Sequence, residues 1–164
     1  MTTPPLERYV DLASSRLGAS VLAASDDFFA PKERLIEVAE PVFDAGRYTD
    51  HGKWMDGWET RRRRRGDRDW CVIALATAGR IHDIVVDTAH FDGNHPEACA
   101  IDGVHAPGIH DIVELETQAW RELLPRVPLG PSAAHRFNVM FMSEILSITR
   151  LGLRPMVFPC VAAV

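Results

Sequence analysis

Short segments rich in β-branched and other apolar residues recur along this sequence, and they limit its possible folds more than any other feature. The clearest are residues 70–77 (WCVIALAT), 81–91 (IHDIVVDTAHF) and 98–104 (ACAIDGV), separated by Gly, Asp, Asn and Pro. Further candidate strands are residues 20–25, 112–117, 135–142 and 144–153. No segment has the pattern of a convincing long helix. The sequence therefore predicts an all-β protein, an antiparallel β-sandwich of jelly-roll type.

Length and charge narrow the class of protein further. The 164 residues suffice for one domain with a core, and the net charge of -5 argues against nucleic-acid binding, which needs clustered Lys and Arg. No apolar run reaches the roughly 18 residues of a membrane span, and the first residues lack a signal-peptide core. Cys71, Cys99 and Cys160 lie in apolar contexts and are expected in the core. We expect a cytoplasmic protein with neither nucleic-acid nor membrane partners.

Residues 30–69 form the longest stretch in which apolar residues follow neither the helical nor the strand period. Pro and Gly interrupt it, yet Phe43, Tyr48 and several other aromatic residues give it much apolar surface to bury. This combination predicts a long ordered loop that forms a site. Before the first candidate strand, residues 4–17 are expected to form a short helix or an irregular packing arm.

Residues 52–61 (GKWMDGWETR) are the densest mixture of tryptophans and ionisable groups. Tryptophans exclude water and strengthen electrostatic contacts, while the charged side chains can recognise charge and transfer protons. The alternative is a structural loop that Trp54 and Trp58 pin to the sheet, with its charges in solvent. The cluster leads into five arginines at 61–65. This run could be a localisation signal, a phosphate patch, or a solvated loop whose first members point into a site.

A second polar cluster, residues 87–96 (DTAHFDGNHP), follows a strong strand. His90 could act as a general acid or base because its reference pKa lies close to neutrality. The alternative is that His90 and Asn94 merely cap the corner between strand and loop. No histidine has the spacing to Cys or carboxylates that specifies zinc, and no glycine-rich phosphate loop is present. The sequence therefore predicts neither a metal nor a cofactor.

Several strings resemble the allantoicase repeat over about residues 8–137. They are SDDFFAPKERL (25–35), GRYTDHGKWMDGWETRRRR (46–64), DWCVIAL (69–75), VDTAHFDGNHP (86–96) and the expected loop WRELLPRVPLGP (120–131). The resemblance implies a galactose-binding-domain-like jelly roll with long ordered loops. It also implies an allantoate amidinohydrolase, a hydrolase of C–N bonds in linear amidines. Such an enzyme converts allantoate to ureidoglycolate and urea in the allantoin branch of purine catabolism.

Allantoicases carry two related jelly-roll repeats per chain, and this sequence resembles an N-terminal one. Residues 1–137 are expected to form the repeat, while residues 138–164 diverge from the expected pattern and either complete or truncate the same domain. Two alternatives to an active enzyme follow: a non-catalytic jelly-roll module that binds a ligand, or an inactive truncated remnant. A homo-oligomer could cover apolar surface that a second repeat would otherwise bury.

The implied substrate, allantoate, carries a carboxylate and two ureido groups on one carbon. A competent site needs a cation for the carboxylate, a proton donor for the departing urea nitrogen and a base for water. The expected catalytic residues are His90, Glu59 and Asp56. The expected substrate-binding residues are Arg61, Lys53, Trp54, Thr60, Asn94 and Asp27.

Overall fold

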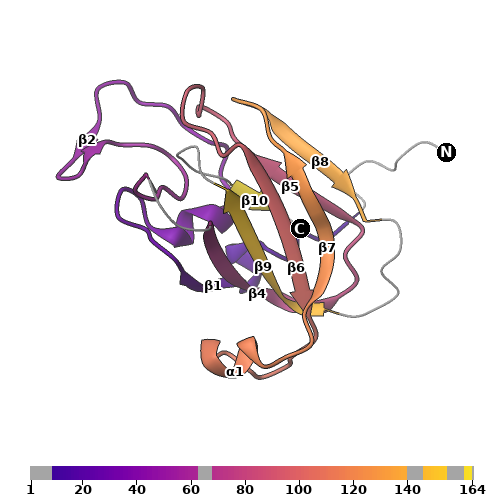
Figure 1. Ribbon diagram of the computed structural model, residues 1–164. Coiled ribbons are helices and arrows are strands. Elements are labelled where there is room, and N and C mark those ends of the chain that lie inside the picture. Colours follow the sequence, from indigo (N-terminus) through magenta and orange to yellow (C-terminus); the bar gives the residue numbers. More distant parts are fainter. Residues whose placement is uncertain (1–8, 63–67, 140–145, 155–160, 164) are drawn as a thin grey trace.

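The computed structural model describes residues 9–62, 68–139, 146–154 and 161–163, and its described strands form two main antiparallel sheets and a small hairpin (Figure 1). The larger sheet has the order β1-β4-β9-β6-β7. Its strands are β1 (Ser20–Ala24), β4 (Asp69–Gly79), β9 (Leu146–Arg154), β6 (Ala98–Val104) and β7 (Arg121–Pro128). The second sheet comprises β10 (Val161–Ala163), β5 (Asp83–Asp87) and β8 (Ala134–Asn138), in that order. The hairpin is β2 (Tyr48–Thr49) with β3 (Gly52–Lys53).

The centre of the larger sheet is occupied by β9, which comes late in the sequence. Leu151 of β9 pairs with Cys71 of β4 on one side and with Ile101 of β6 on the other. The divergent segment that follows Phe137 thus contributes a central strand.

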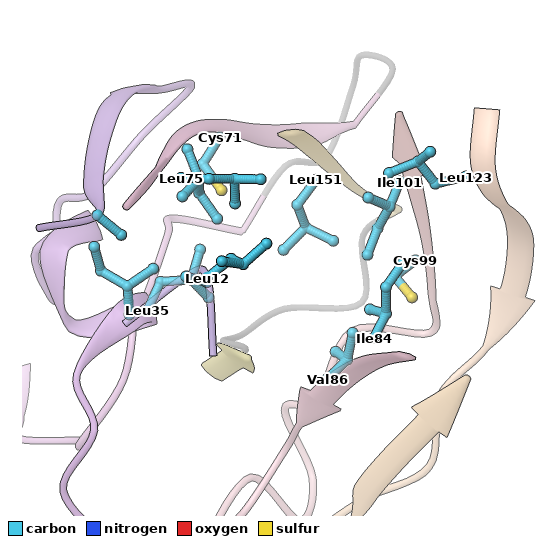
Figure 2. Close-up of a cluster of buried hydrophobic side chains, with 14 of the residues drawn as sticks. Leu12, Leu35, Cys71, Leu75, Ile84, Val86, Cys99, Ile101, Leu123 and Leu151 are labelled. Carbon is cyan, nitrogen blue, oxygen red and sulfur yellow. The ribbon is translucent and has the colours of Figure 1, made fainter. Parts of the chain in front are cut away.

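The two main sheets enclose one core (Figure 2). Side chains alternate along β4, so Cys71 and Ile73 enter this core, where they join Ile84 and Val86 of β5. Trp70 and Val72 of β4 face the other way and pack in a smaller cluster with residues of α1 (Ile112–Glu116). The outer face of the larger sheet is therefore partly covered, and β4 separates two distinct environments.

The predicted β-sandwich is confirmed. The structure has strands in the segments predicted at 20–25, 70–77, 81–91, 98–104, 135–142 and 144–153, although β5 covers only Asp83–Asp87 of its segment. The predicted residues 140–145 lie outside the described part. Cys71 and Cys99 are buried as expected, whereas Cys160 also falls outside the described residues.

Two predictions are wrong. Residues 112–117 were expected to be a strand, but they form α1, because the Asp111 carboxylate accepts a hydrogen bond from the Glu114 N–H (3.0 Å) and caps the first turn. Residues 120–131 were expected to be a loop, but most of them form β7. This strand pairs with β6 and buries Leu123 and Leu124.

The long segment from residue 30 to β4 is an ordered loop in its described part. It contains the 3-10 helix η3 (Lys32–Ile36) and the β2–β3 hairpin, and β2 projects away from the sheets (Figure 1). Residues 9–17 form an irregular arm with one short 3-10 helix, η2 (Ser15–Leu17). No helix among the described residues is long and apolar enough to cross a membrane.

Candidate functional site

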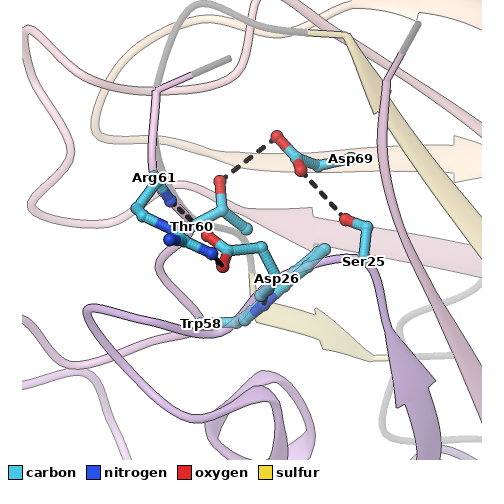
Figure 3. Close-up of polar contacts among 6 residues, drawn as sticks. All are labelled: Ser25, Asp26, Trp58, Thr60, Arg61 and Asp69. Carbon is cyan, nitrogen blue, oxygen red and sulfur yellow. Dashed lines mark hydrogen bonds and ion pairs between the residues drawn. The ribbon is translucent and has the colours of Figure 1, made fainter. Parts of the chain in front are cut away.

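The end of the long loop is held against the segment that follows β1. Glu59 makes an isolated antiparallel bridge with Ala30. The neighbouring Trp58 is completely buried, and its indole N–H donates to the Asp26 carbonyl (2.8 Å; Figure 3). These contacts place residues 58–61 beside the carboxyl end of β1.

Asp26 binds both the backbone and the side chain of Arg61. Its carboxylate accepts hydrogen bonds from the Arg61 backbone N–H (2.5 Å) and from the guanidinium Nε (3.1 Å) and Nη2 (2.8 Å) (Figure 3). This ion pair raises the pKa of Arg61. The Arg61 side chain is 64% exposed, and the Asp26 contacts do not use its Nη1 atom. Arg61 is thus oriented by Asp26 while most of its side chain remains exposed.

Thr60 points into the structure instead of toward solvent. Its hydroxyl donates to Asp69 Oδ2 (3.2 Å), and the Ser25 hydroxyl donates to Asp69 Oδ1 (2.9 Å; Figure 3). The Ser25 oxygen in turn accepts the Trp70 backbone N–H (3.1 Å). Asp69 therefore ties the loop to the adjoining ends of β1 and β4.

Glu59 differs from the other described acids of this loop because its side chain is buried. Its side-chain Oε2 is buried, and no hydrogen-bond partner for it exists among the described residues. Burial disfavours the charged carboxylate and raises the pKa of Glu59 to about 7. A group with this pKa can donate and accept a proton near neutrality.

Asp56 and Trp54 both contact Arg34 of η3. Asp56 accepts hydrogen bonds from Arg34 Nη1 and from the Val42 backbone N–H, both at 2.9 Å. The guanidinium groups of Arg34 and Arg47 lie 5.2 and 4.0 Å from the centre of a Trp54 ring. These contacts fold the long loop back on itself.

Lys53 and His90 meet at Phe43. The Lys53 ammonium lies 4.4 Å from the ring centroid of Phe43, and the ring centroids of Phe43 and His90 are 5.7 Å apart. His90 Nε2 is 3.1 Å from the Pro41 carbonyl oxygen, and because a carbonyl only accepts, the imidazole donates there. His90 also has a left-handed φ of 67°, which is uncommon outside glycine. Its ring is thus fixed against the long loop.

The hairpin links this pair to the Arg61 region. His51 stacks on Phe28 (4.2 Å between ring centroids), and the Arg61 guanidinium lies 5.0 Å from the same ring. His51 is two residues before Lys53. The structure therefore has two groups of cation and aromatic contacts, one around Phe28 and one around Phe43, and the β2–β3 hairpin carries a member of each.

Two expected site residues lie apart from these contacts. Asp27 has a side chain that is 47% exposed and lies 3.8 Å from the Lys32 ammonium. Asn94 is half-buried in the loop between β5 and β6.

Sequence reasoning missed several residues that organise the site. They are Ser25, Asp26, Phe28, Arg34, Phe43, His51 and Asp69. The one sequence signal that could have found them is their position, because most of them lie within or next to the strings at residues 25–35 and 46–64. The residue type alone does not show that Asp26, and not its neighbour Asp27, pairs with Arg61.

The arrangement offers an oriented cation, a carboxylic acid whose pKa lies near 7, and aromatic side chains that contact the cations. An oriented arginine suits a carboxylate ligand, and the acid suits proton transfer. No group of three or more His, Cys, Asp or Glu residues with metal-binding geometry occurs in the described ranges.

Comparison with known proteins gives a consistent match. The family model described as Allantoicase repeat matches residues 10–156, and this range extends past Phe137. The chain is 51% identical over 128 residues to "Probable allantoicase 1" of Burkholderia mallei, covering 78% of this chain and 37% of that protein. It is 47% identical over 146 residues to "Probable allantoicase" of Rhizobium meliloti, covering 89% and 42%. The chain thus spans less than half the length of these relatives.

The solved structures agree with this match. The crystal structure of allantoicase from Saccharomyces cerevisiae superposes with a TM-score of 0.77 and 32% identity, covering 94% of this chain and 45% of that one. A chitosan-binding module from Paenibacillus sp. IK-5 superposes over 94% of this chain and 95% of its own with a TM-score of 0.57, but at 11% identity it shows the shared fold alone.

Proposed function

The chain belongs to the allantoicase family, and from this membership we propose that it hydrolyses allantoate to ureidoglycolate and urea in purine catabolism. The observation that carries the proposal is the pairing of an oriented cation, Arg61, with a buried acid, Glu59, two residues earlier. Allantoate carries the carboxylate that the first would bind and the nitrogen that the second would protonate.

The proposed reaction needs one water molecule and a balanced proton transfer. The bond between the central carbon and one ureido nitrogen breaks, and that nitrogen leaves as urea with an added proton. The hydroxyl of water bonds to the central carbon and gives ureidoglycolate. One group that first donates a proton and then accepts one satisfies both needs.

We assign that group as Glu59. As a neutral acid it donates its proton to the departing nitrogen, and as a carboxylate it then takes a proton from water, so it ends in its starting state. A pKa of about 7 supports both steps at neutral pH. His90 is the second candidate for proton transfer because it contacts Phe43, the ring that Lys53 also contacts.

Arg61 is assigned to the substrate carboxylate. The Asp26 contacts fix its orientation through Nε and Nη2, so that Nη1 can bond a ligand oxygen. Lys53 supplies a second cation, and Trp54, Asn94 and Asp27 remain proposed substrate contacts. For Asp56 and Thr60, whose polar atoms bond Arg34 and Asp69, we propose that they position the loop.

Two further features of the whole protein are also proposed. A reducing compartment such as the cytoplasm suits the two buried free thiols, Cys71 and Cys99. Self-association would cover the exposed apolar side chains of the long loop, which include Val42, Phe43 and Tyr48.

The test is urea release from allantoate by the purified 164-residue chain. Wild type should release urea, Glu59→Gln should lower kcat by at least about a hundredfold, and Arg61→Gln should chiefly raise KM. Glu97→Gln and Arg126→Gln are the matched controls, because these residues form an exposed pair on the sandwich and should leave both constants unchanged.

Different negative results contradict different parts of the proposed function. A folded wild-type chain that releases no urea contradicts the hydrolase proposal for this chain, and allantoate binding without urea release favours a non-catalytic module. Urea release that is unchanged in folded Glu59→Gln rejects the role of Glu59 and leaves His90→Gln as the next variant to measure.

A further inference from the structure

The dipeptide Asp-Gly occurs three times in this chain, at Asp56–Gly57, Asp92–Gly93 and Asp102–Gly103. In such a pair the backbone nitrogen of the glycine can attack the side-chain carboxyl carbon of the aspartate, because glycine has no side chain that hinders the approach. The attack closes a cyclic succinimide. It needs a carboxyl group that can turn toward the next nitrogen, so the local structure decides which pair reacts.

Two of the three pairs are held in place. Gly103 lies in β6, where it pairs with Arg121 of β7 and with Thr149 of β9. Gly57 is buried, and both carboxylate oxygens of Asp56 accept hydrogen bonds of 2.9 Å. Neither pair can close the ring without local unfolding, which costs free energy.

Asp92–Gly93 has the opposite surroundings. Both residues are exposed in the loop between β5 and β6, and a Cβ atom added to Gly93 would have no atom of a more distant residue within 4 Å. Among the described residues, the Asp92 carboxylate has one hydrogen-bond partner, the Ser132 hydroxyl, which donates to Oδ1 (2.5 Å). The loss of this one exposed bond frees the carboxyl carbon to turn toward the Gly93 nitrogen.

His95 favours one of the two ways in which the succinimide ring can open. Its Nδ1 atom lies 3.1 Å from the backbone carbonyl oxygen of Asp92, and because a carbonyl only accepts, the imidazole donates there. A hydrogen bond to this oxygen polarises the carbonyl and assists the attack of water on its carbon. Attack at this carbon leaves Gly93 joined to the former side-chain carbon, which is the isoaspartate product.

We infer that Asp92 is a modification site, at which the Asp92–Gly93 peptide bond converts to isoaspartate through a succinimide while His95 directs the ring opening. The other two Asp-Gly pairs stay unmodified in the folded chain. No step uses Glu59 or Arg61, so the inference is independent of the proposed hydrolysis.

Water alone balances the reaction. The Gly93 nitrogen bonds to the side-chain carboxyl carbon of Asp92, a carbon–oxygen bond of the protonated carboxyl group breaks, and the oxygen leaves as water with the proton of the nitrogen. A second water molecule adds to the backbone carbonyl carbon, and the bond from that carbon to the nitrogen breaks. The chain keeps its mass and gains a free α-carboxylate, the group that protein-isoaspartate methyltransferases methylate.

The test ages the folded 164-residue chain at neutral pH in water enriched in oxygen-18. Every molecule that passes through the succinimide gains the heavy oxygen, and a protein-isoaspartate methyltransferase with tritiated S-adenosylmethionine labels those that end as isoaspartate. Peptide mapping should place both labels at Asp92, at a level at least about tenfold above Asp56 and Asp102. In concentrated guanidinium chloride the three pairs should react at similar rates.

Gly93→Ala is the main variant. The added methyl group lies in open space in the folded chain but hinders ring closure, so modification at Asp92 should fall on the order of tenfold. Gly46→Ala, at an exposed glycine that follows Ala45, is the matched control and should leave the rate at Asp92 unchanged. His95→Ala should lower the share of isoaspartate among the products that carry the heavy oxygen.

Several outcomes overturn the inference. They are equal modification of the three pairs in the folded chain and an unchanged rate at Asp92 in folded Gly93→Ala. Heavy oxygen at Asn94 in place of Asp92 would assign the reactive position to deamidation of that amide. An unchanged share of isoaspartate in folded His95→Ala rejects the directing role of His95.

Discussion

Asp56 and Glu59 lie three residues apart in one loop, yet their carboxylates have opposite surroundings. Each Asp56 oxygen accepts a hydrogen bond of 2.9 Å, one from Arg34 and one from the Val42 N–H. Glu59 Oε2 is buried with no partner in the described part of the chain. This contrast supports the proposal that Asp56 positions the loop and that Glu59 transfers protons.

We expect the ionisation of Glu59 to lower the free energy of unfolding as pH rises. Burial raises its pKa in the folded state from 4.5 to about 7. Below pH 4.5 the group is protonated in both states, and between pH 4.5 and 7 only the unfolded chain loses the proton, so stability falls as pH rises. The Glu59→Gln variant should therefore be more stable than wild type at pH 8, by a difference on the order of 3 kcal/mol.

Urea unfolding at pH 4.5 and pH 8 measures this effect. The difference between Glu59→Gln and wild type should be small at the lower pH and large at the higher one. Glu97→Gln, at a carboxylate that is 60% exposed, provides the control and should follow wild type at both. Parallel curves for wild type and Glu59→Gln would show that Glu59 ionises normally in the folded protein.

Asp56→Ala should loosen the long loop. The change leaves the Arg34 guanidinium and the Val42 N–H without their acceptor, so we expect a loss of about 1–2 kcal/mol in the free energy of unfolding. Protease cleavage between residues 37 and 50 should also become faster. Asp27→Ala is the comparison, because its contact with Lys32 is exposed and long, and it should cost less than about 0.5 kcal/mol. Equal protease resistance of both variants would contradict an anchoring role for Asp56.

Thr60→Val tests whether Thr60 supports the structure or contacts substrate. Valine keeps the shape but removes the hydroxyl that donates to the buried Asp69, so stability should fall by about 1–3 kcal/mol. Thermal unfolding measures the change, with Thr49→Val in the exposed hairpin as the control. Unaltered stability together with a raised KM for allantoate would instead place the hydroxyl on the substrate.

Cys71 and Cys99 should be inert toward thiol reagents in the folded protein. Burial raises the pKa of Cys99 to about 12 and raises that of Cys71 as well, so neither forms appreciable thiolate at neutral pH. Peptide mapping after treatment with iodoacetamide should find both residues unlabelled until a denaturant is added. Rapid labelling of either one under native conditions would mean that the sandwich opens readily.

Strand positions were largely predictable from the sequence, because β-branched runs such as residues 98–104 carry their own signal. The errors arose where tertiary or capping contacts decide the structure. A single hydrogen bond from Glu114 to Asp111 accompanies a helical turn at apolar residues that also suit a strand. The ion pair of Asp26 with Arg61 joins residues 35 positions apart, so no local pattern identifies it. The same holds for the burial of Glu59, which depends on how the loop folds over the sandwich.

The position of β9 between β4 and β6 has a consequence during translation. Both neighbours leave the ribosome before Leu146 is synthesised, so their facing edges stay unpaired until β9 arrives. Unpaired strand edges recruit other strands, and nascent chains at this stage are vulnerable to aggregation. A premature stop codon ahead of Leu146 would therefore remove the middle of the sheet, and the product would expose two unpaired strand edges that chaperones would have to bind.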